Sequence, residues 1–173
     1  MLYAIFGLAG VVIVLLAIAV IRTFAMKAPP IPAYTPECAP EELKTAEEKL
    51  GDMIRIPTVS KHEKDDLSDF YRFHEELERL FPLLHQNLEK TVISGTLLYR
   101  WPGKDPARKP ILLMGHQDVV PAEGNWEHEP FSGDMENGKV HGRGSADDKS
   151  AVFAFFQAVE ELLKEGFVPE QDV

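Results

Sequence analysis

The hydrophobic and polar positions divide this chain into an apolar N-terminal stretch and a longer region of mixed character. Residues 2–21 form twenty consecutive positions without a charged side chain. A helix of that length spans about 30 Å, which matches the hydrocarbon core of a bilayer. We therefore predict a single transmembrane helix, acting as a signal anchor, over residues 2–21. A cleaved signal peptide is the alternative, but the apolar run is long for one and no basic residue precedes it.

The segment after the apolar stretch is rich in proline. Residues 22–40 contain five of the thirteen prolines in the chain, and proline favours an extended polyproline conformation. This composition predicts a linker over residues 22–40 and a folded domain over residues 41–173. Cys38, the only cysteine, lies in the predicted linker, which excludes an intrachain disulfide and a cysteine-based zinc site.

Within the predicted domain the apolar positions follow both helical and strand periods, which indicates an α/β fold. Apolar side chains at every third or fourth position predict helices, and prolines or glycines bound them. Alternating or continuous apolar runs next to turn signals predict strands. The predicted helices cover residues 40–54, 66–80 and 151–165. The predicted strands are a hairpin (residues 91–93 and 96–101 around Ser94 and Gly95), a buried parallel strand (residues 111–114) and a short strand (residues 139–141).

Length and charge limit the classes of function. The 173 residues allow one compact domain of about 130 residues after the apolar stretch. The formal net charge is −10, and no cluster of lysines or arginines stands out. A nucleic-acid partner is therefore not expected, because such proteins carry a basic patch. The sequence does not indicate an oligomeric state.

Candidate chemistry gathers around two short motifs. His116 and Asp118 directly follow the predicted strand 111–114, and Asp147 stands in a Gly-Arg-Gly-Ser-Ala-Asp-Asp-Lys run that opens the last predicted helix. Ligands of open α/β sheets bind at the carboxyl ends of strands. A histidine can bind a metal through one ring nitrogen while a carboxylate such as that of Asp118 holds the other. We therefore expect the side chains of His116 and Asp147 to converge.

The order of these motifs resembles the M20 family of zinc metallopeptidases. The resemblance extends from about Glu41 to Val173 and is most similar to the branch containing carboxypeptidase S and Gly-X carboxypeptidase, whose members also carry an N-terminal hydrophobic segment. Its motifs are Ile-Pro-Thr-Val-Ser (residues 56–60), Leu-Tyr-Arg (98–100), His-Gln-Asp-Val-Val-Pro (116–121), Trp126, Pro-Phe-Ser-Gly (130–133) and the glycine-rich run 142–149. The implied fold is the N-terminal part of a zinc-exopeptidase-like catalytic domain, with a mixed sheet flanked by helices.

The resemblance also implies roles for individual residues. His116 would ligate one zinc ion, and Asp147 would bridge two. Asp118 would be the catalytic-site carboxylate that supports His116. A cis peptide bond would follow the bridging aspartate, between Asp147 and Asp148. The implied activity is zinc-dependent hydrolysis of peptide or N-acyl amino acid amide bonds, of the carboxypeptidase type.

The sequence departs from the family pattern in one respect. Family members use a Glu-Glu pair after the next strand, as general base and metal ligand, and no such pair can be placed before Val173. Glu160 and Glu161 lie inside a predicted helix, so we interpret them as part of its solvated face. A catalytic zinc normally takes three protein ligands, and only two are found. We therefore expect these 173 residues to be an incomplete N-terminal portion that is inactive alone.

Other interpretations remain open at this point. Arg143 and Lys149 could soften the repulsion between the carboxylates or be ordinary surface charges. The resemblance makes Trp126 and Phe131 packing anchors of a wall beside the site, although Phe131 fits plain core better. His62, His74 and His85 are expected to be surface or satisfied core residues, whereas His128 and His141 are weaker candidates for substrate or metal contact. Alternative functions are an aminoacylase or deacylase of the same fold and a non-catalytic, membrane-anchored interaction module.

The side of the membrane is also ambiguous. Arg22 and Lys27 follow the apolar stretch and no basic side chain precedes it. The positive-inside rule would therefore place the domain in the cytoplasm. The family resemblance favours the opposite side, so we expect a single-pass membrane protein with a slight preference for an extracytoplasmic domain.

Overall fold

The computed structural model describes residues 2–27, 39–60 and 66–173. It divides into two compact units, residues 1–37 and 38–173. Most of the predicted linker, together with Cys38 and His62, lies outside the described residues, so the predictions for them stay predictions.

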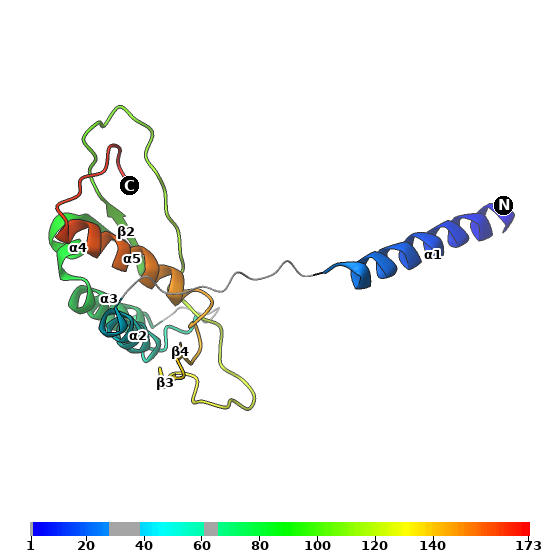
Figure 1. Ribbon diagram of the computed structural model, residues 1–173, viewed down its shortest axis with the longest axis horizontal. Helices are drawn as coiled ribbons and strands as arrows, with labels where there is room; N and C mark the ends of the chain where they lie inside the picture. The colour runs from blue at the N-terminus through cyan, green and yellow to red at the C-terminus, as the bar shows by residue number, and fades with distance from the viewer. Residues whose placement is uncertain (1, 28–38, 61–65) are drawn as a thin grey trace. The chain divides into compact units, whose positions relative to one another are not determined.

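The first unit contains a single described helix, α1 (Leu2–Ala25), which continues four residues past the predicted end of the apolar stretch (Figure 1). Its segment Phe6–Ala25 is long and apolar enough to cross a membrane, and no other helix among the described residues meets that test. Side chains such as Phe24, which is 87% exposed, are not buried by other described residues. A helix that is apolar on all sides requires burial in an apolar phase.

The second unit combines helices with two small sheets. Three helices come first: α2 (Pro40–Ile54), α3 (Ser68–Leu80) and α4 (Pro82–Asn87). The hairpin β1 (Glu89–Ile93) and β2 (Thr96–Arg100) follows, then the hairpin β3 (Met135–Glu136) and β4 (Lys139–Val140), and finally α5 (Lys149–Lys164). The three predicted helices, the first hairpin and the short strand near residue 139 are confirmed.

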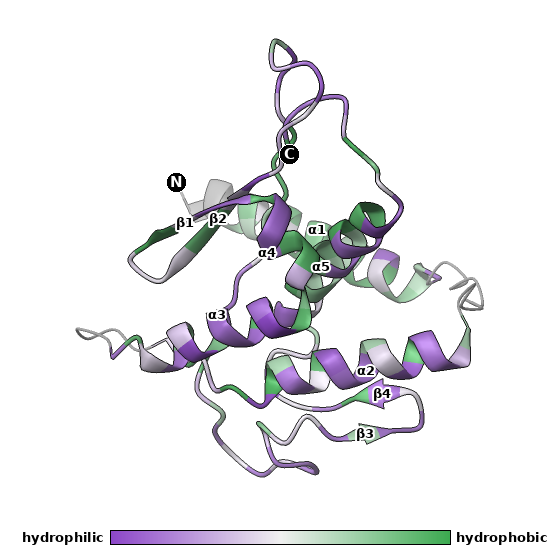
Figure 2. Cartoon of the chain, turned by 90° about the vertical axis from the view of Figure 1, so that its left-hand side faces the viewer, coloured by the Kyte–Doolittle hydropathy of each residue, from purple (hydrophilic) through white to green (hydrophobic). Residues whose placement is uncertain are grey.

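The core of this unit lies between helices. Polar and apolar residues alternate along α2 and α3 (Figure 2), so each helix has one face that can be buried. Pro40 occupies the first turn of α2, where its missing N–H costs no hydrogen bond. The buried apolar cluster consists of Met53, Ile56, Phe73, Leu77, Leu80, Phe81, Leu84 and Val152.

The β1–β2 hairpin owes its register to its turn. Ile93 pairs with Thr96, and the two turn residues Ser94 and Gly95 have φ angles of 48° and 82°. Two positive φ angles match the right-handed twist of the flanking strands, which is why a Ser-Gly pair suits this turn. Asn137 and Gly138, with φ angles of 53° and 72°, close the β3–β4 hairpin in the same way.

The predicted parallel strand at residues 111–114 is wrong for this structure. These residues form no strand, and their side chains are 47–76% exposed. The backbone N–H of Ile111 donates to the carbonyl of Asp172 at 2.9 Å, and Trp101 exchanges two hydrogen bonds with Val173. A strand needs a ladder of such bonds. Among the described residues both sheets are antiparallel pairs, and the isolated bridge Val59–Val119 is parallel. The structure is therefore a mixed helix and strand fold rather than a mixed sheet flanked by helices.

Candidate metal centre

His116 lies between Asp118 and Asp147, which contact opposite edges of its imidazole ring. Its Nδ1 lies 3.0 Å from the backbone carbonyl oxygen of Asp118 and 3.3 Å from the Asp118 carboxylate. Its Nε2 lies 3.0 Å from a carboxylate oxygen of Asp147. In the charged imidazole both nitrogens donate, Nδ1 to Asp118 and Nε2 to Asp147. Loss of the Nε2 proton leaves that nitrogen able to bind a metal while Nδ1 stays paired with Asp118. The convergence expected for His116 and Asp147 is therefore present.

Three neighbouring segments fix the backbone around His116. Val119 donates its N–H to the carbonyl of Thr58 at 2.9 Å and accepts from the N–H of Ser60 at 3.0 Å. The Thr58 hydroxyl donates to the carbonyl of Gln117 at 2.5 Å. The Gln117 amide donates to the Gly95 carbonyl at 2.5 Å, and its oxygen lies 3.0 Å from His74 Nε2. The turn of the first hairpin, helix α3 and residues 58–60 thus hold the loop that carries His116.

Asp147 is positioned by the glycine-rich loop before α5. Gly142 has a φ of 140°, and a Cβ there would lie 2.6 Å from the side chain of Ile54 and 2.8 Å from the carbonyl oxygen of Pro130. Only glycine fits so close an approach at a positive φ. The peptide bond between Asp147 and Asp148 is cis, as the family resemblance implied. Asp148 turns back toward the first motif, since its carboxylate accepts the backbone N–H of His116 at 3.1 Å.

Lys149 has neither of the roles considered from the sequence. Its side chain is fully buried, and its ammonium donates to the carbonyls of Met53 at 2.9 Å and Ile56 at 2.6 Å. Burial lowers the pKa of Lys149 to about 7. These carbonyls belong to the end of α2 and the residues after it, where acceptors lack helical partners. Lys149 therefore ties the start of α5 to the end of α2.

Arg143 makes no ion pair with a carboxylate among the described residues. Its guanidinium stacks over the ring of Trp126 at 4.8 Å, and its backbone N–H donates to Pro130 at 2.7 Å. Its Nε is buried without a hydrogen-bond partner among the described residues. Trp126 itself remains 37% exposed, and Phe131 is half-buried. Trp126 is thus a stacking partner for Arg143 at the surface, while Phe131 is only partly core.

The remaining candidates have structural roles. Glu160 is 3% exposed and its carboxylate accepts the N–H groups of Leu83 at 3.1 Å and Leu84 at 2.8 Å. The interpretation of Glu160 as a solvated residue is therefore wrong, because it caps the first turn of α4. Glu161 is exposed, as predicted. His74, and His85 between Phe81 and Tyr99, are satisfied core residues, as expected.

The electrostatic setting of His116 favours its charged form. Partial burial acts to lower the pKa of His116, but the Asp118 carbonyl and the Asp147 and Asp118 carboxylates outweigh it and raise the pKa. Half of the His116 side chain and 89% of the Asp147 side chain are exposed. An imidazole nitrogen and a carboxylate oxygen 3.0 Å apart, open to solvent, are a donor pair suited to zinc. The residues therefore fit two ligands of a zinc ion.

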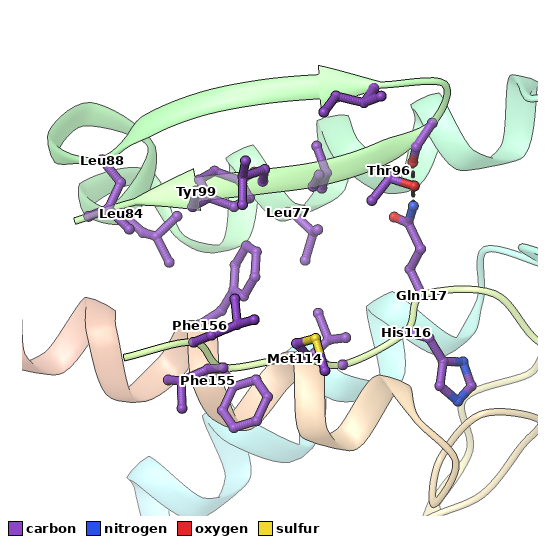
Figure 3. A pocket seen from close by; sticks show the side chains of 18 of the residues that line it. Leu77, Leu84, Leu88, Thr96, Tyr99, Met114, His116, Gln117, Phe155 and Phe156 are labelled. Carbon is purple, nitrogen blue, oxygen red and sulfur yellow. Dashed lines mark hydrogen bonds between the residues drawn. The ribbon is translucent and has the colours of Figure 1, made fainter. Parts of the chain in front are cut away.

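An apolar cavity of about 720 Å³ has His116 among its lining residues (Figure 3). Figure 3 shows Tyr99 and Leu77 on one side and Phe155, Phe156 and Met114 on the other, with His116 turned away at one end. The exposed residues 111–114 border this cavity. It therefore lies along the segment that leads to His116.

Comparison with known proteins identifies relatives of this chain. Residues 112–173 match the family model for peptidase family M20/M25/M40. Carboxypeptidase S of Saccharomyces cerevisiae is 41% identical over 140 residues, which cover 73% of this chain and 24% of the relative. The N-fatty-acyl-amino acid synthase/hydrolase PM20D1 of Xenopus tropicalis is 36% identical over 169 residues, which cover 92% of this chain and 33% of the relative. The chain spans about a quarter of the length of the first such relatives.

Two solved structures share the fold. The M20 family metallo-carboxypeptidase Sso-CP2 from Sulfolobus solfataricus is 24% identical, with a TM-score of 0.54 over 70% of this chain and 28% of that one. Human carnosine dipeptidase 1 is 22% identical, with a TM-score of 0.55 over 76% of this chain and 31% of that one. At these identities the two structures show the fold alone.

Proposed function

Because this chain is a member of peptidase family M20/M25/M40 over residues 112–173, we propose that it supplies one half of a two-zinc amide hydrolase site. His116 and Asp147 are the proposed ligands, with Asp147 bridging the two ions. The observation that carries the proposal is the 3.0 Å approach of His116 Nε2 to the Asp147 carboxylate. Zinc in such a site polarises the scissile carbonyl and lowers the pKa of a bound water.

Asp118 is proposed as the positioning residue of this centre. Its carbonyl and carboxylate oxygens lie 3.0 Å and 3.3 Å from Nδ1 of His116. A carboxylate on the far nitrogen of a metal-binding imidazole fixes the tautomer and the ring orientation. Asp118 therefore holds a proton on Nδ1 and keeps Nε2 available for the metal.

The other ligands and the general base are proposed to come from polypeptide beyond these residues. A catalytic zinc takes three protein ligands and a water. The described residues bring two ligands to this centre, and the two carboxylates Glu160 and Glu161 are committed elsewhere or face solvent. We therefore propose that the 173 residues alone are hydrolytically silent.

The proposed substrate is a peptide or an N-acyl amino acid. Relatives named as carboxypeptidases support cleavage of a peptide at its carboxyl end. Relatives named as N-fatty-acyl-amino acid synthase/hydrolases support the alternative, an acylase of the same fold. Both reactions hydrolyse an amide next to a free carboxylate, so one metal centre serves either.

The domain organisation is proposed from α1 and the sequence. Residues 2–21 anchor the protein in a membrane as a single span, residues 22–40 form a linker, and residues 41–173 carry the metal centre. The helix α1 and its apolar composition support the anchor. An extracytoplasmic location of the domain is proposed on the family resemblance.

The test is hydrolysis by the protein at its full natural length, purified in detergent with zinc held constant. Peptides with free carboxyl ends and N-acyl amino acids are compared as substrates. His116→Ala and Asp147→Ala should each abolish turnover, and Asp118→Ala should weaken zinc binding by about 10–100-fold. Asp69→Ala, which removes an exposed carboxylate paired with Arg72, is the matched control. Retained turnover in the Asp147→Ala protein would exclude its bridging role.

A further inference from the structure

The β3–β4 hairpin brings together two side chains of metal-ligating type, Glu136 and His141, neither of which belongs to the centre at His116 and Asp147. The strands pair Glu136 with Lys139, and His141 follows β4. Side chains two residues apart on an extended chain point to the same face. Glu136 and His141 are therefore diagonal neighbours on one face of the hairpin, within reach of a shared ligand.

A third side chain joins them from the preceding loop. His128 stacks on His141 with ring centroids 4.0 Å apart and an angle of 26° between the planes. Its Nε2 lies 3.8 Å from a carboxylate oxygen of Glu136. One ligand atom from each of His128, Glu136 and His141 lies within 4.8 Å of the other two. Ligands of a tetrahedral zinc at about 2.0–2.1 Å lie roughly 3.4 Å apart, so small side-chain rotations would close the set.

A fourth residue supports this arrangement from behind. The Asp134 carboxylate lies 3.3 Å from Nδ1 of His128, and the Asp134 carbonyl accepts the backbone N–H of His141 at 2.8 Å. A carboxylate on the far ring nitrogen is the partner that orients metal-binding histidines. Asp134 thus presents Nε2 of His128 toward Glu136. Both rings are half-buried and Glu136 is exposed, so an ion has access from solvent.

We propose that His128, Glu136 and His141 form a second transition-metal site, with zinc as the ion that its two imidazoles and one carboxylate suit. The site shares no residue with the centre at His116 and Asp147. It joins the long loop after Val119 to the β3–β4 hairpin, which leads into the glycine-rich loop that carries Asp147. The role of a bound ion would be to fix the position of this loop relative to the hairpin. The proposal does not depend on the proposed hydrolase activity.

The test uses the full 173-residue chain in detergent and zinc alone as the probe. Zinc bound per chain is measured by equilibrium dialysis in the background His116→Ala/Asp147→Ala, which removes the other centre. This background should retain one zinc per chain and gain thermal stability on zinc addition. Adding His128→Ala/His141→Ala should abolish both effects. Asp134→Asn should weaken binding by about 10–100-fold, and Glu127→Gln should leave it unchanged.

Two results would overturn the proposal. The background protein could bind no zinc at micromolar free concentration, or the added histidine substitutions could leave binding intact. Thermal unfolding without zinc shows whether each variant is folded. Glu136→Gln provides a second check, because it preserves the shape of the side chain and should still weaken zinc binding at least about 10-fold if the carboxylate is a ligand.

Discussion

Two adjacent glutamates of α5 have opposite surroundings. The Glu160 carboxylate is buried and accepts two backbone N–H groups at the start of α4, whereas Glu161 is exposed and accepts from Gln157. Glu160→Ala leaves those N–H groups without their acceptor and should lower the free energy of unfolding by about 1–3 kcal/mol. Glu161→Ala is the control and should change it by less than about 0.5 kcal/mol. Urea denaturation of the two variants checks this, and equal effects would contradict the capping role.

His85 should make stability depend on pH. Burial lowers its pKa below the usual value, despite the Phe81 carbonyl that its Nδ1 approaches at 2.8 Å. The unfolded imidazole then binds a proton near pH 6.5 while the folded one does not, so the free energy of unfolding falls as the pH drops below about 6.5. His85→Gln should show a smaller loss of stability between pH 7 and pH 5 than the unchanged protein. Parallel pH profiles would show that His85 titrates alike in both states.

At the level of single residues, the sequence predicts chemistry better than burial. The convergence of His116 with Asp147 was predicted from motifs at the end of an expected strand and the start of a helix. The burial of Lys149 and Glu160 did not, because each depends on unpaired backbone groups of another helix, at Met53 and Leu84. Sequence spacing within α5 carries no information about those distant helix ends.

The glycine-rich loop is the element whose shape the proposed metal centre depends on most. Gly142→Ala would place a Cβ 2.6 Å from Ile54 and 2.8 Å from the Pro130 carbonyl oxygen. We expect a loss of about 1–3 kcal/mol in the free energy of unfolding. Gly124→Ala is the control, because its φ of 85° is also one that L side chains rarely adopt and nothing lies within 4 Å of the added carbon. Equal melting temperatures for the two variants would contradict the steric argument.

Elements defined by local signals were predicted correctly, and the strand that needs distant partners was predicted wrongly. The β1–β2 hairpin depends on its own Ser-Gly turn, and α2 depends on its own apolar period and on Pro40. Residues 111–114 have the apolar composition of an interior strand, but their exposed side chains and the single bond from Ile111 to Asp172 do not make one. Composition indicates that a segment can be a strand, while neighbouring strands decide whether it is.

For the whole molecule, the anchor proposed in α1 should determine how the protein partitions between membrane and water. Its Phe6–Ala25 segment is twenty residues long, or about 30 Å of helix. The chain expressed in cells should therefore remain with membranes after alkaline carbonate extraction. A chain that starts at residue 39 should be recovered in the supernatant instead of the membrane pellet. Release of the longer chain by carbonate, or its recovery without residues 2–21, would contradict a retained anchor.

We propose that His116 and Asp147 hold zinc, and crystallography can locate the ion. Crystals of the full-length natural protein are grown with zinc, and diffraction is recorded on both sides of the zinc absorption edge. We expect an anomalous peak about 2.0–2.2 Å from both His116 Nε2 and an Asp147 carboxylate oxygen. An ordered protein whose anomalous peaks contact neither side chain would contradict the claim.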